Sequence, residues 1–218
     1  MSSDLIKQRL IITYGKFDAL KYTSNLDTAK IWERVLRRAG LPLLYSQGFN
    51  TRPRIQLAAA LPLGITSECE LIDISLKERI ALDGLAERLL AVSPHGLRIY
   101  QIEEASPHMP SLESMVRSAE YRIHFLDDID PAQVQQAIDT MLNTGSIIKV
   151  VQGKRRKSVY DLRPLIYDLH LDDRGDLIAH VAVGKGGNIR PDEILHEMQI
   201  DASAYTVHRL HLHLDKVR

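Results

Sequence analysis

The pattern of apolar and polar positions predicts strands and helices in the order βαββαβ over the first half of the chain. Runs with a period of two alternate with longer segments in which apolar residues recur at helical spacing. The predicted elements are strand 9–14, helix 26–39, strand 54–60, strand 69–76, helix 77–92 and strand 97–103. This order is typical of a ferredoxin-like split βαβ unit.

A similar order of elements returns after a break. Residues 105–114 contain two prolines and no periodicity, which is typical of a linker. The elements predicted beyond it are strand 119–126, helix 131–142, strand 147–152, a hairpin of strands 165–171 and 177–183, helix 191–198 and strand 205–214. We therefore expect an α+β fold of two tandem ferredoxin-like (βαββαβ) units with antiparallel sheets, the second with an extra strand. The domains would be residues 1–106 and 117–218; a single mixed α+β domain is the alternative.

The helix predicted over residues 26–39 is amphipathic and basic. Ser24 and Asp27 have the spacing of a capping box at its start, with Asp in place of the more usual Glu or Gln. A glycine directly after the helix suits a left-handed terminating position. The positive charge is concentrated at the C-terminal end, at Arg37 and Arg38, where cations complement the helix dipole.

The stretch 45–54, here called the motif loop, follows this helix in the N-terminal domain. It contains a glycine and an asparagine, which tolerate backbone angles that other residues avoid, and many hydrogen-bonding side chains. Next to a basic helix end, such a loop is a candidate anion site; the alternative is a loop whose side chains bond its own backbone. The candidate residues are Arg37, Arg38, Tyr45, Ser46, Asn50, Arg52 and Arg54.

Several stretches of the chain carry a specific pattern: Ser24-Asn25-Leu26-Asp27, Arg37-Arg38-Ala39-Gly40-Leu41-Pro42, Tyr45-Ser46-Gln47-Gly48-Phe49-Asn50, Leu61-Pro62-Leu63-Gly64, Asp161-Leu162-Arg163-Pro164 and Arg190-Pro191-Asp192-Glu193. The pattern resembles the radical SAM-linked protein family, a bacterial domain of unknown function found beside or fused to radical SAM proteins. The resemblance implies a radical SAM protein as partner and brings no established activity. The chain departs from the pattern at Asn25, where the family usually has His, and at Thr51-Arg52, in place of Pro-His.

Composition limits the location and the redox chemistry of the chain. Its 218 residues have a formal net charge of +0, so no overall field attracts nucleic acid or membrane. The single cysteine, Cys69, excludes an internal disulfide and is typical of a reducing cytoplasm. Neither a signal-peptide core nor a membrane-spanning apolar run is present in the sequence. We therefore expect a cytoplasmic protein that does not contact the membrane.

Sequence motifs for catalysis are absent from this chain. A radical SAM enzyme needs three clustered cysteines to hold its iron–sulfur cluster, so this chain is not that enzyme. The sequence has no nucleophile elbow, phosphate-loop lysine motif or dinucleotide fingerprint. We assign no catalytic residue, metal ligand or cofactor. The alternative is zinc on His211 and His213, which share one face of the last strand, with His208 or His196 nearby; a solvated sheet face explains the same alternation.

Two further basic segments are candidates for phosphate contact. Lys154, Arg155 and Arg156 form a basic turn, although hairpin tips are often charged simply to stay soluble. Lys185 and Arg190 flank a glycine-rich turn before a helix, where backbone N–H groups accept anions; a flexible connection is the alternative. Together with the motif loop, these segments could form a surface that follows a phosphate backbone.

Three functions fit these observations. The first is a non-catalytic accessory or substrate-binding module for a radical SAM partner, binding RNA or another phosphate-bearing substrate. The alternatives are a small enzyme acting on an anionic substrate held by the motif loop, and a protein-interaction scaffold. A continuous basic groove would favour the first, a closed pocket around Ser46 and Asn50 the second, and a flat apolar patch the third.

Overall fold

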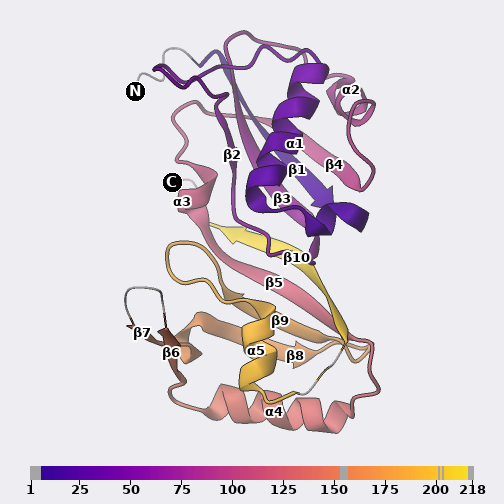
Figure 1. The fold of residues 1–218 in the computed structure, drawn as a ribbon, viewed down its shortest axis with the longest axis vertical. Helices are drawn as coiled ribbons and strands as arrows, with labels where there is room; N and C mark the ends of the chain where they lie inside the picture. Colours follow the sequence, from indigo (N-terminus) through magenta and orange to yellow (C-terminus); the bar gives the residue numbers. More distant parts are fainter. Residues whose placement is uncertain (1–5, 153–156, 201, 203, 216–218) are drawn as a thin grey trace. The chain divides into compact units, whose positions relative to one another are not determined.

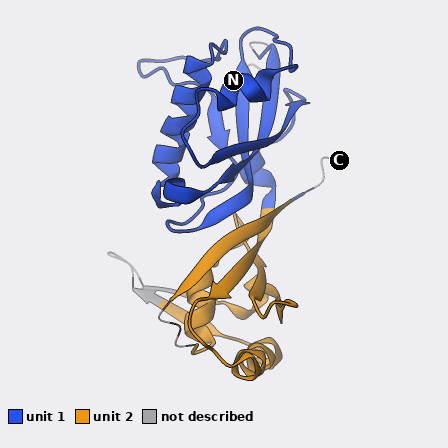
Figure 2. Ribbon diagram, turned by 90° about the vertical axis from the view of Figure 1, so that its right-hand side faces the viewer, with its two compact units in different colours: residues 1–116, 214–218 blue, residues 117–213 orange. Residues whose placement is uncertain are grey.

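The computed structural model describes residues 6–152, 157–200, 202 and 204–215. It divides the chain into two compact units, drawn in different colours in Figure 2: unit 1 is Met1–Val116 with Leu214–Arg218, and unit 2 is Arg117–His213. Both units combine helices with antiparallel strands, so the predicted α+β class is confirmed. In the described part of the chain, no helix is long and apolar enough to cross a membrane.

Unit 1 is built on an antiparallel sheet whose strands lie in the order β4-β1-β3, with β2 on the outer side of β3. Its elements, labelled in Figure 1, are β1 (Gln8–Lys16), η2 (Asp18–Tyr22), α1 (Asn25–Arg38), β2 (Ile55–Leu57), β3 (Thr66–Leu76), α2 (Leu85–Leu90), β4 (Leu97–Ala105) and α3 (Leu112–Met115). The register places Ile12 of β1 opposite Ile72 of β3 and Ile102 of β4. Because β1 is paired on both sides and almost wholly buried, it forms the centre of this sheet.

The helix α1 forms where the pattern predicts it and buries its apolar stripe. Trp32 and Leu36 are both 0% exposed, and the Trp32 ring meets the Tyr14 ring of β1 edge-on with centroids 4.9 Å apart. At the start of the helix, the Ser24 hydroxyl accepts the Asp27 N–H at 3.1 Å and donates to the Asp27 carboxylate at 2.7 Å. The Asp27 carboxylate therefore bonds the Ser24 hydroxyl, a variation on the capping box that the spacing predicts.

The end of α1 follows the predicted glycine termination. Gly40 has a φ of +70°, in the left-handed region that favours glycine. The next residue, Leu41, donates its N–H to the Leu36 carbonyl at 3.1 Å, which is the long bond of a Schellman motif. The chain is therefore turned sharply at this point and directed toward the motif loop.

The second predicted helix is shorter than its periodicity suggests. The pattern predicts a helix over residues 77–92, whereas α2 spans only Leu85–Leu90. Gly84 precedes α2 with a φ of +68°, which interrupts the helical backbone, and the segment before it is held by long-range bonds. Ile80 donates its N–H to the Gln8 side chain at 2.9 Å, a contact between residues 72 apart. Tertiary contacts therefore override the apolar spacing here.

Unit 2 contains an antiparallel sheet in the order β10-β5-β9-β8 and a separate hairpin. Its elements are β5 (Val116–Phe125), α4 (Pro131–Asn143), β6 (Ile148–Gln152), β7 (Lys157–Asp161), η3 (Arg163–Leu165), β8 (Ile166–Leu171), β9 (Leu177–Ala182), α5 (Pro191–Glu197) and β10 (Tyr205–Leu214). The extra strand of the prediction is β6, and it pairs with β7 in a two-stranded sheet of its own. The strand β7 was not predicted, because it is short and has no strong period.

The two faces of the unit 2 sheet differ in character. Along β5, Ala119, Tyr121 and Ile123 are at most 1% exposed and belong to the core of the unit. Successive side chains of a strand point to opposite faces, so Glu120 and Arg122 lie on the other face. Both are partly exposed, which makes this the polar face of the sheet.

Candidate functional site

The basic end of α1 lies against the motif loop. The Arg37 guanidinium is 5.7 Å from the centroid of the Tyr45 ring, and an Nη atom is 2.7 Å from the Glu33 carboxylate. The Tyr45 ring and the Arg37 side chain are both exposed. The structure thus brings the helix end and the start of the loop together, with one acidic side chain beside them.

The motif loop is closed by its own hydrogen bonds. The Ser46 N–H donates to the Arg52 carbonyl at 2.8 Å, and the Arg52 N–H donates to the Ser46 hydroxyl at 3.0 Å. Tyr45 and Pro53 form a β-bridge at the base of the loop. At its tip, Phe49 is fully exposed and Asn50 is exposed. Ser46 therefore fits the alternative prediction, a loop whose side chains bond its own backbone, because its hydroxyl stabilises the loop. The exposed side chains of Phe49 and Arg52 face solvent instead.

Four arginines of this region have no acidic partner within the part of the chain that the structure describes: Arg34, Arg38, Arg52 and Arg54. Arg34 lies on α1 and was not among the predicted residues, although its exposed position on the helix is visible in the sequence pattern. The first three are exposed and Arg54 is partly buried. Since isolated cations on a neutral protein attract anions, these arginines are candidates for contact with an anionic ligand.

Arg54 and a buried ion pair line a hollow on the face of the unit 1 sheet that is opposite to α1. The hollow has a volume of about 490 Å³, and Arg9, Asp73 and Ser75 also line it. The Arg9 Nε donates to both Asp73 carboxylate oxygens, at 3.0 and 3.1 Å. Because the remaining Arg9 nitrogens donate to backbone carbonyls, Arg9 has a structural role, and only Arg54 among the bases of this hollow is left for a ligand.

The predicted phosphate site before α5 carries its own acids. Arg190 pairs with Asp192, whose carboxylate lies 3.0 Å from the Arg190 Nε. The first turn of α5 also contains Glu193, so negative charge already occupies the positive end of this short helix. Lys185 is exposed on the preceding turn. The predicted residues Lys154, Arg155 and Arg156 lie outside the described residues.

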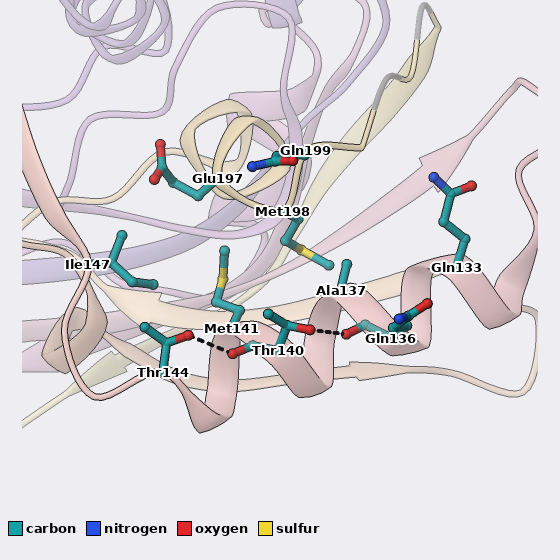
Figure 3. A pocket seen from close by; sticks show the side chains of 10 residues that line it. All are labelled: Gln133, Gln136, Ala137, Thr140, Met141, Thr144, Ile147, Glu197, Met198 and Gln199. Carbon is teal, nitrogen blue, oxygen red and sulfur yellow. Dashed lines mark hydrogen bonds between the residues drawn. The ribbon is translucent and has the colours of Figure 1, made fainter.

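A second hollow, of about 400 Å³, lies in unit 2 between α4 and the end of α5 (Figure 3). Its two threonine hydroxyls are engaged with backbone carbonyls of α4. The Thr140 hydroxyl donates to the Gln136 carbonyl at 2.8 Å, and the Thr144 hydroxyl donates to the Thr140 carbonyl at 2.7 Å. Glu197 at its edge is paired with Lys149. These contacts leave the hollow without a charged group directed at a ligand.

Three side chains with metal-ligating atoms meet on the polar face of unit 2. Glu120, His180 and His213 each offer one ligand atom, and these atoms lie within 4.8 Å of one another. The Glu120 carboxylate is 2.6 Å from the His213 Nε2, and the rings of His180 and His213 have centroids 4.8 Å apart. The His180 Nε2 also lies 2.8 Å from the Ser118 hydroxyl.

The surroundings of His180 lower its affinity for protons. Burial is the largest cause of the lowered pKa of His180, and the nearby His213 ring lowers the pKa further. Glu120 and Asp168 act in the opposite direction, because a carboxylate stabilises the imidazolium. His180 therefore favours the neutral imidazole, which is the form that binds metals.

Of the histidines considered from the sequence, only His213 belongs to this cluster. The ring of His211 lies 6.2 Å from that of His213, centroid to centroid. Glu120 and His180 were missed because they come from strands about sixty residues apart. The sequence signal for this site was only that both residues lie on predicted strands. The register that places them opposite each other depends on the tertiary structure.

Comparison with known proteins gives a family and distant structural likenesses. No curated protein matches the chain. Among solved structures, the chain is similar to a "Cbf5-Nop10-Gar1 Complex" at 13% identity and a TM-score of 0.46, covering 97% of this chain and 51% of that one. An "archaeal box H/ACA sRNP Nop10-Cbf5 complex" gives 15% identity and a TM-score of 0.41, with 96% and 49% covered.

The chain thus spans about half the length of the chains it matches in these two complexes. The model of one protein family matches residues 9–191, which is most of the sequence. Its description is "Uncharacterized protein conserved in bacteria (DUF2344)". On this match, the chain belongs to the DUF2344 family of bacterial proteins.

Proposed function

We propose that this protein is a non-catalytic binding module that holds single-stranded RNA on unit 1 for a radical SAM partner. The binding surface, here called the arginine–aromatic surface, consists of Arg34, Arg37, Arg38, Tyr45, Phe49 and Arg52. Arg54 is left out, because its side chain lines the hollow on the other face of the sheet. Arginine suits phosphate because its planar fork makes two parallel charge-assisted bonds. Exposed aromatic rings suit unpaired bases, since stacking contributes roughly 1–3 kcal/mol per base.

The observation that carries the proposal is that three exposed arginines without acidic partners among the described residues, Arg34, Arg38 and Arg52, lie on the same helix and loop that carry two exposed aromatic rings. Elsewhere in the chain, several arginines are paired with carboxylates: Arg9, Arg79, Arg122 and Arg190. On a chain with no net charge, unpaired cations gathered on one helix end and one loop favour a local anionic ligand. A fully exposed phenylalanine at the loop tip has no role in the core and favours a stacking partner.

The radical SAM partner is supported by the sequence motifs described above. With one cysteine, these 218 residues cannot hold an iron–sulfur cluster of the radical SAM type, so the cluster would come from outside them. A partner protein would supply the reaction, while this chain would supply the ligand. Co-expression with a radical SAM protein of the same organism, followed by gel filtration, tests this part: co-elution is expected, and separate elution would contradict it.

We also propose that each unit is a ferredoxin-like domain. The strand order β4-β1-β3-β2 of unit 1 supports this, because it equals 4-1-3-2 in the numbering of a βαββαβ unit. In unit 2, the order β10-β5-β9-β8 is also 4-1-3-2 when the β6–β7 hairpin is treated as an insertion. The chain divides between Val116 and Arg117, which is close to the start of the predicted second domain at residue 117. Independent expression of residues 1–116 tests it, since a folded fragment is expected.

The RNA proposal is tested by fluorescence anisotropy with a labelled single-stranded RNA over a series of salt concentrations. Affinity should fall steeply with salt, and Arg38→Ala or Arg52→Ala should reduce the logarithmic salt slope by about one unit each. Phe49→Ala should weaken binding by about 1–3 kcal/mol while leaving the salt slope unchanged. These two signatures separate phosphate contacts from base stacking.

The matched control is Arg174→Ala, which removes the same charge from an exposed turn of unit 2. Its RNA affinity should equal that of the wild type. If neither the arginine nor the Phe49 substitutions change affinity in correctly folded protein, this surface is rejected and the protein-interaction scaffold becomes the leading alternative. Single-stranded DNA and inorganic phosphate serve as competitors that identify the recognised group.

A further inference from the structure

We infer that Glu120, His180 and His213 form a binding site for a zinc-class transition-metal ion on the polar face of the unit 2 sheet. The ligand atoms of all three lie within 4.8 Å of one another. This site is independent of the proposed RNA surface, because it uses other residues in the other unit.

The sheet itself brings these three side chains together. Glu120 of β5 lies directly opposite His180 of β9 in the antiparallel register. Side chains of directly opposed residues share one face and have Cβ atoms roughly 4.5–5.5 Å apart. The third residue, His213, comes from β10, the neighbour of β5 on its other side. The ligands are therefore carried by three adjacent strands, which are more rigid supports than loops.

The ligand set selects the class of metal. Two imidazoles and one carboxylate suit Zn²⁺ and its neighbours in the first transition row, whereas Mg²⁺ and Ca²⁺ prefer oxygen ligands throughout. Three protein ligands also leave one tetrahedral position for water or a further ligand. The His213 side chain is 44% exposed and the Glu120 side chain 27%, so solvent reaches the site.

A small movement of the side chains completes the geometry. Metal–nitrogen and metal–oxygen bonds of about 2.0–2.2 Å in a tetrahedron separate ligand atoms by roughly 3.3–3.5 Å. The Glu120 and His213 atoms, which are 2.6 Å apart, have to separate by somewhat less than an ångström, and His180 has to approach by about an ångström. On binding, the ion takes the place of the hydrogen bond between Glu120 and His213, and the neutral His213 ring ligates through the nitrogen that carries no proton.

The Ser118 hydroxyl engages the Nε2 atom of His180, which leaves Nδ1 as the nitrogen for the ion. The His180 Nε2 lies 2.8 Å from the hydroxyl of Ser118, a residue that is only 5% exposed. Hydrogen bonds of this kind fix the ring orientation of metal-ligating histidines, and their loss typically costs about 10- to 100-fold in metal affinity. If Glu120 and His213 formed only a surface ion pair, a second oriented imidazole would not be needed beside them. The His180 ring nevertheless lies 4.8 Å from the His213 ring, centroid to centroid.

The test is Zn²⁺ binding by the full chain, expressed without a histidine tag and stripped with a chelator. Titration against a chromophoric competitor should show one Zn²⁺ per chain, which excess Mg²⁺ or Ca²⁺ does not displace. Co²⁺ should bind with the intense visible bands of a four-coordinate site. Absence of Zn²⁺ binding by the wild type would overturn the inference.

Substitutions locate the site. His180→Gln and Glu120→Gln should each lower Zn²⁺ affinity by more than the roughly 10- to 100-fold expected for Ser118→Ala. The matched control is His196→Gln, which removes an exposed histidine of α5 in the same unit and should leave affinity unchanged. Equal affinity in the wild type and the Glu120 and His180 variants would show that other histidines bind the ion. Circular dichroism checks the fold, and Ser118→Ala provides the readout if a ligand variant does not fold.

Discussion

Arg9 and Asp73 form a buried ion pair that also fixes the segment between β4 and α3. The Arg9 Nε donates to both Asp73 oxygens, and the two side chains are 7% and 9% exposed. The Arg9 Nη atoms donate to the carbonyls of Ser106, Met109 and Pro110. The stretch predicted as a linker is thus tied to the central strand of unit 1 by one side chain.

Removing one member of this pair should destabilise unit 1 strongly. Asp73→Asn leaves the Arg9 guanidinium buried without its counter-charge, and such a loss costs about 3–5 kcal/mol. Urea unfolding followed by the fluorescence of Trp32, the single tryptophan, measures the change. Arg79→Ala, which breaks the exposed pair with Glu104, should cost no more than about 1 kcal/mol. Equal effects of the two substitutions would contradict the structural role of Arg9.

Glu33→Gln should strengthen RNA binding at the arginine–aromatic surface. The Glu33 carboxylate lies 2.7 Å from Arg37 and competes with any phosphate for that guanidinium. Releasing one exposed pair is worth up to about 1 kcal/mol, which is roughly a 2- to 5-fold gain in affinity. Anisotropy at low salt measures it. Asp173→Asn, at an exposed turn of unit 2, makes the same charge change and should have no effect; weaker binding by the Glu33 variant would count against the surface.

Gly40→Ala should destabilise the end of α1 through backbone strain alone. The φ of Gly40 is +70°, and no atom lies within 4 Å of the position that a Cβ would take. The left-handed conformation costs a residue with a Cβ about 1–2 kcal/mol. Thermal unfolding should therefore shift downward for this variant. The control is Gly145→Ala, which has equal space and no positive φ, and a similar loss in both would refute the strain argument.

Asp161→Asn should weaken the start of the β6–β7 hairpin in a pH-dependent way. The N–H of Ile147 is the largest cause of the lowered pKa of Asp161, and the Arg163 N–H adds to it. Because the folded pKa lies below the ordinary value of 3.8, the stabilisation is complete above that pH and is lost as pH falls through the folded pKa.

Urea unfolding of the wild type and the Asp161 variant at pH 6 and pH 3 measures this linkage. The difference in unfolding free energy between the two proteins should be larger at pH 6. A difference that grows toward pH 3 would show that the carboxylate does not stabilise the folded state.

The sequence alone determined those parts of the fold that depend on neighbours along the chain. The helix α1 forms over its apolar stripe, starts at Ser24 and ends at Gly40, because periodicity and capping act within a few residues. The α+β class also follows from the pattern, since alternation with a period of two marks most strands. Arg37 and Tyr45 are eight residues apart, so their proximity follows from one helix end and one turn.

Only the tertiary structure decided which distant residues meet. The Arg9 contacts span up to about 100 residues, and the pairing of β6 with β7 depends on a hairpin whose second strand has no strong period. Glu120 faces His180 because of a strand register, and a shift of one residue would turn either side chain to the opposite face of the sheet. Local patterns carry no information about register, because it is set by the packing of the whole sheet. The sequence therefore predicted most of the elements, with β7 and the true length of α2 as exceptions, and the packing placed the buried ion pair and the histidine–glutamate cluster.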